Sequence, residues 1–241
     1  MNDRSSVPRL AAKAGGPRRH AAVTPRRLDA CADAFARGGF DRAQRVLGRM
    51  CDAAEPQAAC EHVLAPVARG LGDRWVADTC DFATLTLAMG RLHSLLHGVS
   101  RRWRPPAGAR LPPRRALVAA APGEQHIFGA AMIAEALRAA GWEVTVPQGA
   151  SAADLVARVK GARFDLVGLS VACDASVEGV ARTIADLRAA ARGAPAFLVG
   201  GRPFSERPEL ARATGADGVG RDCATTLALA ETLCGRLAVA A

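Results

Sequence analysis

The chain has 241 residues, half of them apolar, and a formal net charge of +9. This length allows one large domain or two modest ones, each with its own core. There is no run of about 18 apolar residues to span a bilayer, and the N-terminus lacks the apolar core of a signal peptide. Seven cysteines without a C-x-x-C pair imply neither a disulfide framework nor a zinc site. These features predict a cytoplasmic protein with reduced thiols.

The positive charge is concentrated in two segments. Residues 1–27 contain seven Arg or Lys and one Asp, and residues 100–115 contain six Arg and no acid. The remainder of the chain is mildly acidic, so the high pI does not come from a folded basic face. We interpret residues 1–25 as a disordered basic tail. Such a tail either contacts nucleic acid or an acidic partner or is a solubilising extension.

Residues 26–104 have apolar residues at helical spacing. We expect helices over 29–50, divided at Gly38-Gly39, over 56–72, ended by Gly70-Leu71-Gly72, and over 81–103. Four helices joined by short links predict a small helical bundle. The Pro- and Arg-rich segment 105–114 is interpreted as a linker to a second domain.

From residue 115 to the end, short apolar runs alternate with helical patterns. We predict strands over 114–121, 142–146, 165–172, 196–201 and 216–219. The helices between and after them are expected over 126–140, 152–160, 177–191, 210–214 and 223–237. Continuous apolar strands separated by helices indicate a parallel sheet covered on both faces. The predicted fold is therefore α/β, a flavodoxin-like, doubly wound sheet of five strands preceded by the helical bundle.

The candidate site lies at the carboxyl ends of the predicted strands, where ligands bind in such sheets. Glu124, His126 and Gly129 follow the first strand. Ser170 ends the third strand, and Gly200-Gly201 end the fourth. A histidine here can bind a metal through one ring nitrogen while the other bonds to Glu124. Gly129 lets the backbone pass close to a bulky group.

These residues together are similar to the D-x-H-x-x-G, S-x-L and G-G fingerprint of cobalamin-binding domains. The resemblance implies that His126 is the lower axial ligand of cobalt and that Glu124 orients it. It also implies that Ser170, Gly200 and Gly201 line the slot for the nucleotide tail. Two positions depart from the pattern. Glu124 replaces Asp, and Ser170-Val171-Ala172 lacks the Leu, so the tail slot departs from the family pattern.

The helical half supports the same interpretation. Leu71-Gly72-Asp73-Arg74-Trp75 is similar to the L-G-x-x-W segment of helical caps that cover the upper face of cobalamin. The resemblance implies that Trp75 lies on that axial side, although burial in a core is the ordinary role of Trp. The Glu-His pair that follows the Trp in light-sensing repressors has no counterpart at 81–87. His93 and His97, one helical turn apart, are interpreted as ordinary helix-face residues.

The loop PGEQHIFG, followed by AEALRAAGWEV, LSVACD and VGGRPF, resembles the AerR/PpaA group of photosynthesis regulators. It also resembles the haem-binding sensor domains of AppA-type antirepressors. The resemblance implies a light-responsive, cobalamin-binding transcriptional regulator of photosynthesis genes, with haem as the alternative cofactor. It further implies an antirepressor that acts on a DNA-binding repressor of the PpsR/CrtJ type.

Two other functions fit the pattern. One is a corrinoid carrier protein that serves separate methyltransferases, and the other is a flavodoxin-like module without a cofactor. No nucleophile, base and orienting group gather beside His126 in the sequence, which argues against an enzyme. No helix-turn-helix segment precedes the bundle, so we expect any DNA contact to run through a partner or the basic tail.

Overall fold

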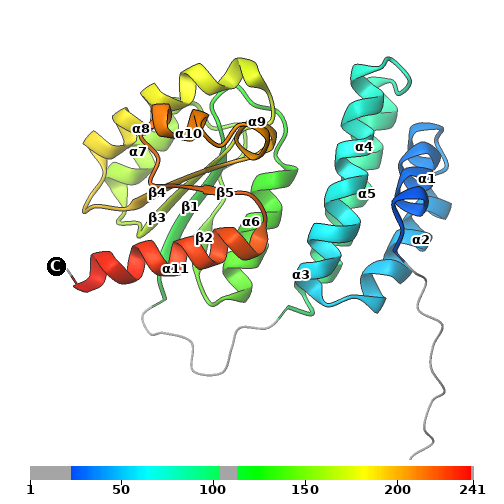
Figure 1. Cartoon of the computed structure of the whole chain (residues 1–241), viewed down its shortest axis with the longest axis horizontal. Helices are drawn as coiled ribbons and strands as arrows, with labels where there is room; N and C mark the ends of the chain where they lie inside the picture. The colour runs from blue at the N-terminus through cyan, green and yellow to red at the C-terminus, as the bar shows by residue number, and fades with distance from the viewer. Residues whose placement is uncertain (1–22, 104–112, 240–241) are drawn as a thin grey trace, which may run out of the picture.

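Residues 23–103 and 113–239 are described by the structure, a computed structural model in which a helical cap precedes an α/β domain (Figure 1). Most of the predicted basic tail and most of the predicted linker therefore lie outside the described residues. The α/β domain contains β1 Arg115–Ala120, β2 Glu143–Thr145, β3 Leu166–Ser170, β4 Ala196–Gly200 and β5 Gly218–Gly220. They form one parallel sheet in the order β2-β1-β3-β4-β5. The predicted flavodoxin-like fold is confirmed.

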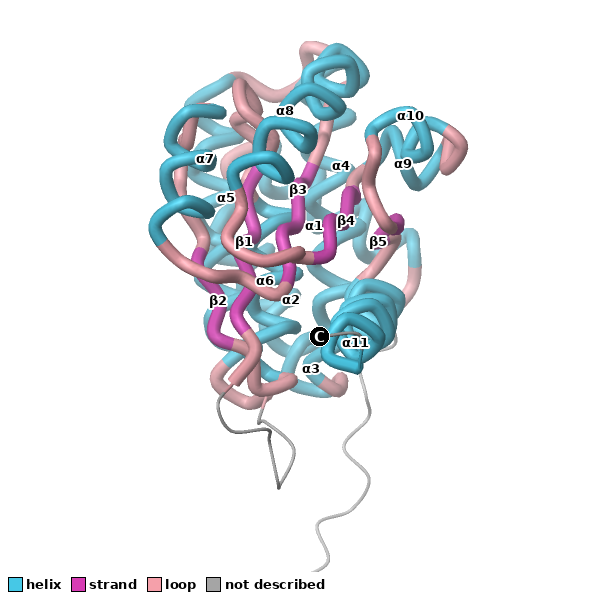
Figure 2. Tube along the Cα trace, turned by 90° about the vertical axis from the view of Figure 1, so that its left-hand side faces the viewer, coloured by secondary structure: helices cyan, strands magenta, loops and turns pink. Residues whose placement is uncertain are grey.

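Helices cover both faces of the sheet, which explains why its central strands are apolar throughout. They are α6 Phe128–Ala139, α7 Ala152–Gly161, α8 Val177–Ala190, α9 Arg202–Glu206, α10 Leu210–Thr214 and α11 Cys223–Val239. Helices α6 and α11 pack together on one face, and α7, α8 and α10 lie on the other (Figure 2). Helix α9 was not predicted, because its single turn follows β4 directly, with Pro203 in the first turn, and is too short to show an apolar period.

The cap consists of helices, as predicted. They are α1 Pro25–Ala36, α2 Phe40–Ala53, α3 Pro56–Ala59, a π-helical turn at Cys60–Leu64, α4 Ala65–Val76 and α5 Phe82–Ser100. Thr24 caps α1, and Asp81 caps α5 by accepting a hydrogen bond from the backbone N–H of Thr84 at 2.8 Å. The helix that contains the π turn is continuous from residue 56 to 76.

The prediction that Gly70-Leu71-Gly72 ends this helix was wrong. Leu71 is fully buried in the core of the cap. A Cβ atom on Gly70 would lie 3.3 Å from Cβ of Ala32 in α1, so the glycine permits close contact between the two helices. The packing between α1 and α4 thus outweighs the cost of a glycine inside a helix, which is about 1 kcal/mol relative to alanine. As a result, Trp75 lies in the last turn of α4.

Helix α6 joins the two halves of the molecule. Ala130 and Leu137 of α6 pack toward the sheet, while Phe128 and Ala136 belong to the same apolar core as the cap. The cap also contacts the start of α11, where the backbone N–H of Ala224 donates to Glu61 Oε1 at 3.0 Å. The Ala-rich sequence of α6 follows from this position, since it must fit between the sheet and α5.

A second link joins the cap to the edge of the sheet. Asp73 Oδ1, in the last turns of α4, lies 3.3 Å from Arg202 Nη1 at the start of α9. Helix α9 directly follows β4, so the end of α4 stands beside the carboxyl edge of the sheet (Figure 1). Among the described residues, no helix has the length and apolar content needed to cross a membrane.

Candidate functional site

Four residues form a row across the carboxyl edge of the sheet. Ala120 of β1 pairs with Ser170 of β3, Ser170 with Gly200 of β4, and Gly200 with Gly220 of β5. Ser170 and Gly200, which lie 30 residues apart in sequence, are therefore direct neighbours. Ser170 and Gly200 thus end neighbouring strands at the same edge of the sheet, as the strand pattern predicts.

Hydrogen bonds hold Glu124 in the loop that follows β1. After β1 the chain turns at Gly123, which has φ +87°, and the backbone N–H of Glu124 donates to the carbonyl of Ala121 at 2.9 Å. The carboxylate then turns inward, and only 2% of the side chain is exposed. Its Oε1 accepts hydrogen bonds from the backbone N–H groups of Ala172 and Cys173, both at 2.9 Å. The carboxylate thus fixes the loop after β1 to the loop after β3.

The same carboxylate orients His126. Its Oε2 lies 3.2 Å from His126 Nδ1, and the His126 side chain is 58% exposed. When the Nδ1–H group donates a hydrogen bond to Glu124, the lone pair of Nε2 is left for a metal. This assignment of the tautomer follows from the hydrogen-bond partner. The arrangement is the one that the sequence predicts for a metal-binding histidine and its orienting carboxylate.

Hydrogen bonds keep Glu124 ionised despite its burial. Burial on its own would raise the pKa of Glu124, but hydrogen bonds from the Cys173 amide, His126 and the Ala172 amide hold that pKa below its ordinary value. A hydrogen bond from the Ser176 hydroxyl acts in the same direction. An ionised Glu124 is the form that accepts a hydrogen bond from Nδ1–H and so holds His126 in the tautomer whose Nε2 can bind a metal.

Sequence reasoning missed the residues that hold Glu124. Ala172, Cys173 and Ser176 belong to the loop and the 3₁₀ turn after β3, and two of them act through backbone amides. The identity of a side chain carries no information about a backbone donor. The only sign in the sequence is that Asp174 and Ser176 follow the apolar strand β3 within a few residues.

The glycines of the fingerprint stand where a side chain would collide with a neighbouring strand or loop. A Cβ on Gly129 would lie 3.0 Å from Ser170 Oγ, so the start of α6 approaches the end of β3 closely. A Cβ on Gly200 would lie 2.6 Å from the carbonyl oxygen of Gly220. Gly201 has φ +112°, and its Cβ would lie 1.8 Å from the carbonyl oxygen of Val171. These glycines therefore let the chain pack tightly along the edge, whatever further role they have toward a ligand.

An exposed apolar surface stands on the cap beside this edge. The indole of Trp75 is 40% exposed and meets the Phe82 ring edge-on, with 6.2 Å between ring centroids. Val76 and Leu87 are more exposed still, at 84% and 58%. Trp75 is thus partly solvent-accessible and is not a buried core residue. The link between Asp73 and Arg202 places the end of α4 on the side of the sheet where Ser170 and Gly200 lie.

His93 and His97 differ in their surroundings, and neither joins His126. His93 packs edge-on against Phe128 at 5.0 Å, and its Nδ1 lies 2.9 Å from the carbonyl oxygen of Met89. Among the described residues, its buried Nε2 has no hydrogen-bond partner. His97 is exposed on α5.

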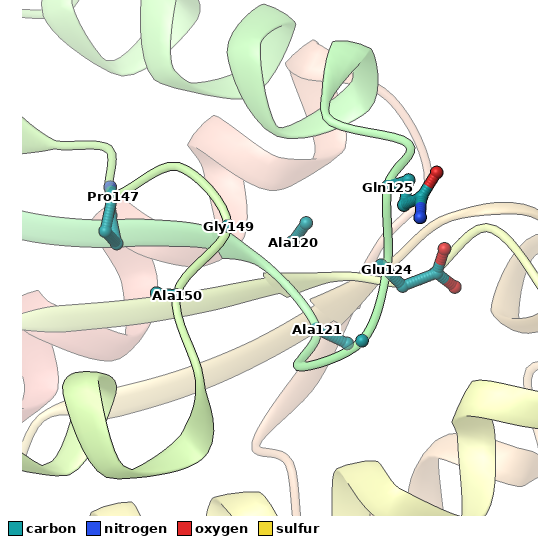
Figure 3. Close-up of a pocket in the computed structure, with 8 residues that line it drawn as sticks. Ala120, Ala121, Glu124, Gln125, Pro147, Gly149 and Ala150 are labelled. Carbon is teal, nitrogen blue, oxygen red and sulfur yellow. The ribbon is translucent and has the colours of Figure 1, made fainter.

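A pocket of about 210 Å³ opens beside the loop that carries His126. Its lining residues are Ala120, Ala121, Gly123, Glu124 and Gln125 on one side and Pro147, Gly149 and Ala150 on the other (Figure 3). The carboxylate of Glu124 points away from Pro147 and Ala150. The pocket therefore opens beside the loop that carries His126, at the same edge of the sheet.

The donor set fits a metal held in a large planar macrocycle. His126 offers an exposed imidazole nitrogen on a loop, and its carboxylate partner is buried and fixed. An exposed ligand of this kind can reach a metal whose other positions are filled by a macrocycle, and the apolar surface around Trp75 suits the upper side of such a group.

Comparison with known proteins identifies the α/β half. Residues 114–229 match the family model of the B12 binding domain. The chain has the fold of the monomethylamine corrinoid protein of Methanosarcina barkeri, with a TM-score of 0.66 at 17% identity over 86% of this chain and 98% of that one. The match to the B12 binding domain indicates cobalamin as the cofactor, in preference to haem.

Two curated relatives extend the match. The HTH-type transcriptional repressor CarH of Myxococcus xanthus is 34% identical over 66% of this chain, which spans 52% of the length of that repressor. A 20.5 kDa protein from the bchF-crtJ intergenic region of Rhodobacter capsulatus is 31% identical over 67% of this chain and 84% of its own length. The chain thus belongs to the family of cobalamin-binding proteins, with a B12 binding domain, that includes this Rhodobacter protein.

Proposed function

We propose that this protein is a light-responsive, cobalamin-binding regulator of photosynthesis genes. In this proposal it is an antirepressor without enzymatic activity, and it acts through a DNA-binding repressor of the PpsR/CrtJ type. The observation that carries the cobalamin site is the fixed pair of Glu124 and His126, which leaves Nε2 of an exposed imidazole free to bind a metal.

Each part of the site has a distinct task in this proposal. Glu124 holds the tautomer and orientation of His126, which binds cobalt from below. Gly129 lets the loop approach the edge of the sheet. Ser170, Gly200 and Gly201 stand along the edge where the nucleotide tail enters. Trp75 covers the upper side together with its apolar neighbours. Bound alkylcobalamin would supply a light-sensitive cobalt–carbon bond, and the residues named above would hold the cofactor between the sheet edge and the cap.

The relatives favour regulation over catalysis. One is a transcriptional repressor, and the other is encoded between bchF and crtJ. The chain spans about half the length of the repressor CarH. Action through a separate DNA-binding protein is part of the proposal.

The ligand assignment is tested by His126→Ala. We expect the wild type to bind hydroxocobalamin with the base-off spectrum of histidine coordination, and the variant to lose this spectrum while its far-UV circular dichroism is unchanged. His97→Ala is the matched control, because His97 is an exposed histidine on α5. An unchanged cobalamin spectrum in His126→Ala would show that another group is the axial ligand.

The regulatory role is tested by capturing partners from an extract of the native cell. The bait is the full chain loaded with adenosylcobalamin, either kept dark or illuminated. We expect a DNA-binding repressor to be recovered in amounts that differ between the dark and illuminated samples, together with a light-dependent change of the absorption spectrum. Light-independent recovery of the repressor would remove the photoreceptor part of the proposal.

A corrinoid carrier is the second candidate function. The observation that favours it is the match of cap and α/β domain together to almost the whole of the methylamine corrinoid protein. At 17% identity this likeness shows the fold alone. In the same capture experiment, recovery of methyltransferases in place of a repressor would decide for the carrier.

A further inference from the structure

Three different side chains that can bind a metal meet at the candidate site. Glu124 and His126 come from the loop after β1, and Cys173 comes from the loop after β3. His126 Nδ1 lies 3.2 Å from Glu124 Oε2 and 4.0 Å from Cys173 Sγ. The three ligand atoms all lie within 4.8 Å of one another. The sequence did not predict this cluster, because Cys173 lies 47 residues from His126.

The spacing suits Zn²⁺. Zinc binds thiolate, imidazole and carboxylate at about 2.0–2.3 Å in tetrahedral geometry, so its ligand atoms stand roughly 3.2–3.6 Å apart. The separation between Nδ1 and Oε2 is already 3.2 Å, and the separation between Sγ and Nδ1 exceeds the range by a few tenths of an ångström. The separation between Sγ and the Glu124 ligand oxygen is within 4.8 Å, so the thiol must move toward both other ligand atoms. Cys173 is exposed, and rotation of its side chain can bring the thiol closer.

Hydrogen bonds already fix the position of the Glu124 carboxylate beside His126. Glu124 Oε1 is occupied by two backbone N–H groups, and Oε2 faces His126. The other six cysteines of the chain are buried, which leaves Cys173 as the exposed thiol. Three protein ligands on the open side of a loop leave a fourth position for water.

We propose that the cobalamin-free protein binds Zn²⁺ through Glu124 Oε2, His126 Nδ1 and Cys173 Sγ, and that zinc and cobalamin exclude each other. Zinc loses all but one of its water ligands as these three atoms bind it. The Cys173 thiol releases its proton to solvent, and the imidazole proton leaves Nδ1, which breaks the hydrogen bond to Glu124, while Nε2 takes up a proton from solvent. No oxidation state changes. A neutral imidazole with zinc on Nδ1 carries its proton on Nε2, so Nε2 has no lone pair for cobalt. The exclusion rests on the proposed cobalamin function, whereas the zinc site does not.

Zinc binding is measured by calorimetric titration of the full-length, cobalamin-free chain with ZnCl₂. We expect one zinc per chain, and a loss of affinity of at least about 100-fold in Cys173→Ser, since even a residue behind a ligand commonly contributes 10–100-fold. The serine variant keeps the backbone N–H that holds Glu124 in place. His97→Ala should bind zinc like the wild type. Replacing zinc by Co²⁺ should give a thiolate charge-transfer band that Cys173→Ser lacks.

Either of two results would overturn the site. They are a wild type that binds no zinc, and a Cys173→Ser variant that binds zinc as tightly as the wild type.

The exclusion is measured by adding hydroxocobalamin to wild-type protein preloaded with zinc. We expect the spectrum of histidine coordination to be delayed or absent until EDTA removes the zinc. Immediate appearance of that spectrum with zinc still bound would refute the exclusion. If hydroxocobalamin fails to bind even without zinc, the proposed cobalamin function fails, and the zinc titration still decides the zinc site.

Discussion

At the residue scale, Glu124 has the greatest influence on the site. It is a buried carboxylate that accepts two backbone hydrogen bonds and faces His126. Removing its charge would leave these donors without their charged partner in a buried position, which typically costs about 1–3 kcal/mol. The carboxylate therefore both fixes His126 and stabilises the contact between the loops after β1 and β3.

The lowered pKa of Glu124 predicts how the stability of the protein depends on pH. A depressed folded-state pKa contributes stability that is present above the ordinary value of 4.5 and lost as the pH falls through the lowered value. We expect Glu124→Gln to lower the free energy of unfolding by about 1–3 kcal/mol at pH 7. The difference in unfolding free energy between variant and wild type should shrink as the pH falls below the ordinary pKa of 4.5. Urea unfolding above and below that pKa measures this. Glu178→Gln, an exposed change on α8, is the control, and an equal loss in both variants would contradict the assignment.

At the scale of elements, α6 is the helix whose packing decides whether the cap can form its contact with the α/β domain. It is buried toward the sheet through Ala130 and Leu137 and toward α5 through Phe128 and Ala136. Small side chains allow α6 to fit between these layers. Because the loop with His126 leads directly into α6, the packing of this helix also fixes where the loop ends.

A larger side chain in α6 should strain this contact. Ala136 is 1% exposed within the core shared with the cap. Ala136→Leu adds three heavy atoms to a filled space, and we expect a loss of about 1–3 kcal/mol in the free energy of unfolding. Ala189→Leu on the exposed face of α8 should change it by no more than about 0.5 kcal/mol. Urea unfolding compares the two, and equal effects would mean that α6 is not tightly packed against the cap.

At the scale of the whole molecule, the proposed cofactor would lie at the seam between cap and sheet, in contact with both halves. One side of the seam carries the exposed His126 and the row that includes Ser170 and Gly200. The other side carries Trp75 and its exposed apolar neighbours. The ion pair between Asp73 and Arg202 crosses the seam, but both side chains are exposed, so it adds little stability. A bound cofactor would be the stronger connection.

Cobalamin should therefore stabilise the whole chain. At a concentration about 100-fold above its dissociation constant, a ligand specific for the folded state adds about 2.7 kcal/mol. For a protein of this size this corresponds to a rise in Tm of roughly 5–10 °C. Thermal unfolding followed by circular dichroism, with and without hydroxocobalamin in the dark, measures the shift. His126→Ala should show a much smaller rise, and an equal rise in both proteins would place the main binding energy away from His126.

The sequence by itself determined the class of fold and the edge on which the site lies. Apolar strands alternate with helices because each strand is covered on both faces, and this pattern is visible without any tertiary contact. Strand ends in a parallel sheet meet at one edge, so Glu124, His126, Ser170 and Gly200 could be placed together in advance. The family resemblance then gave each of them a role, and the match to the B12 binding domain supports cobalamin.

Only the tertiary structure decided what depends on contacts between distant segments. The helix continues through Gly70 because α1 packs closely against this position. Local helix propensity does not reveal such a contact between two helices. Backbone amides of Ala172 and Cys173 hold Glu124, and a backbone donor leaves no mark in the identity of its residue. The approach of Cys173 to His126 likewise depends on how two loops from different strands meet. Local sequence patterns specify elements and strand ends, whereas side-chain proximity across loops is set by packing of the complete domain.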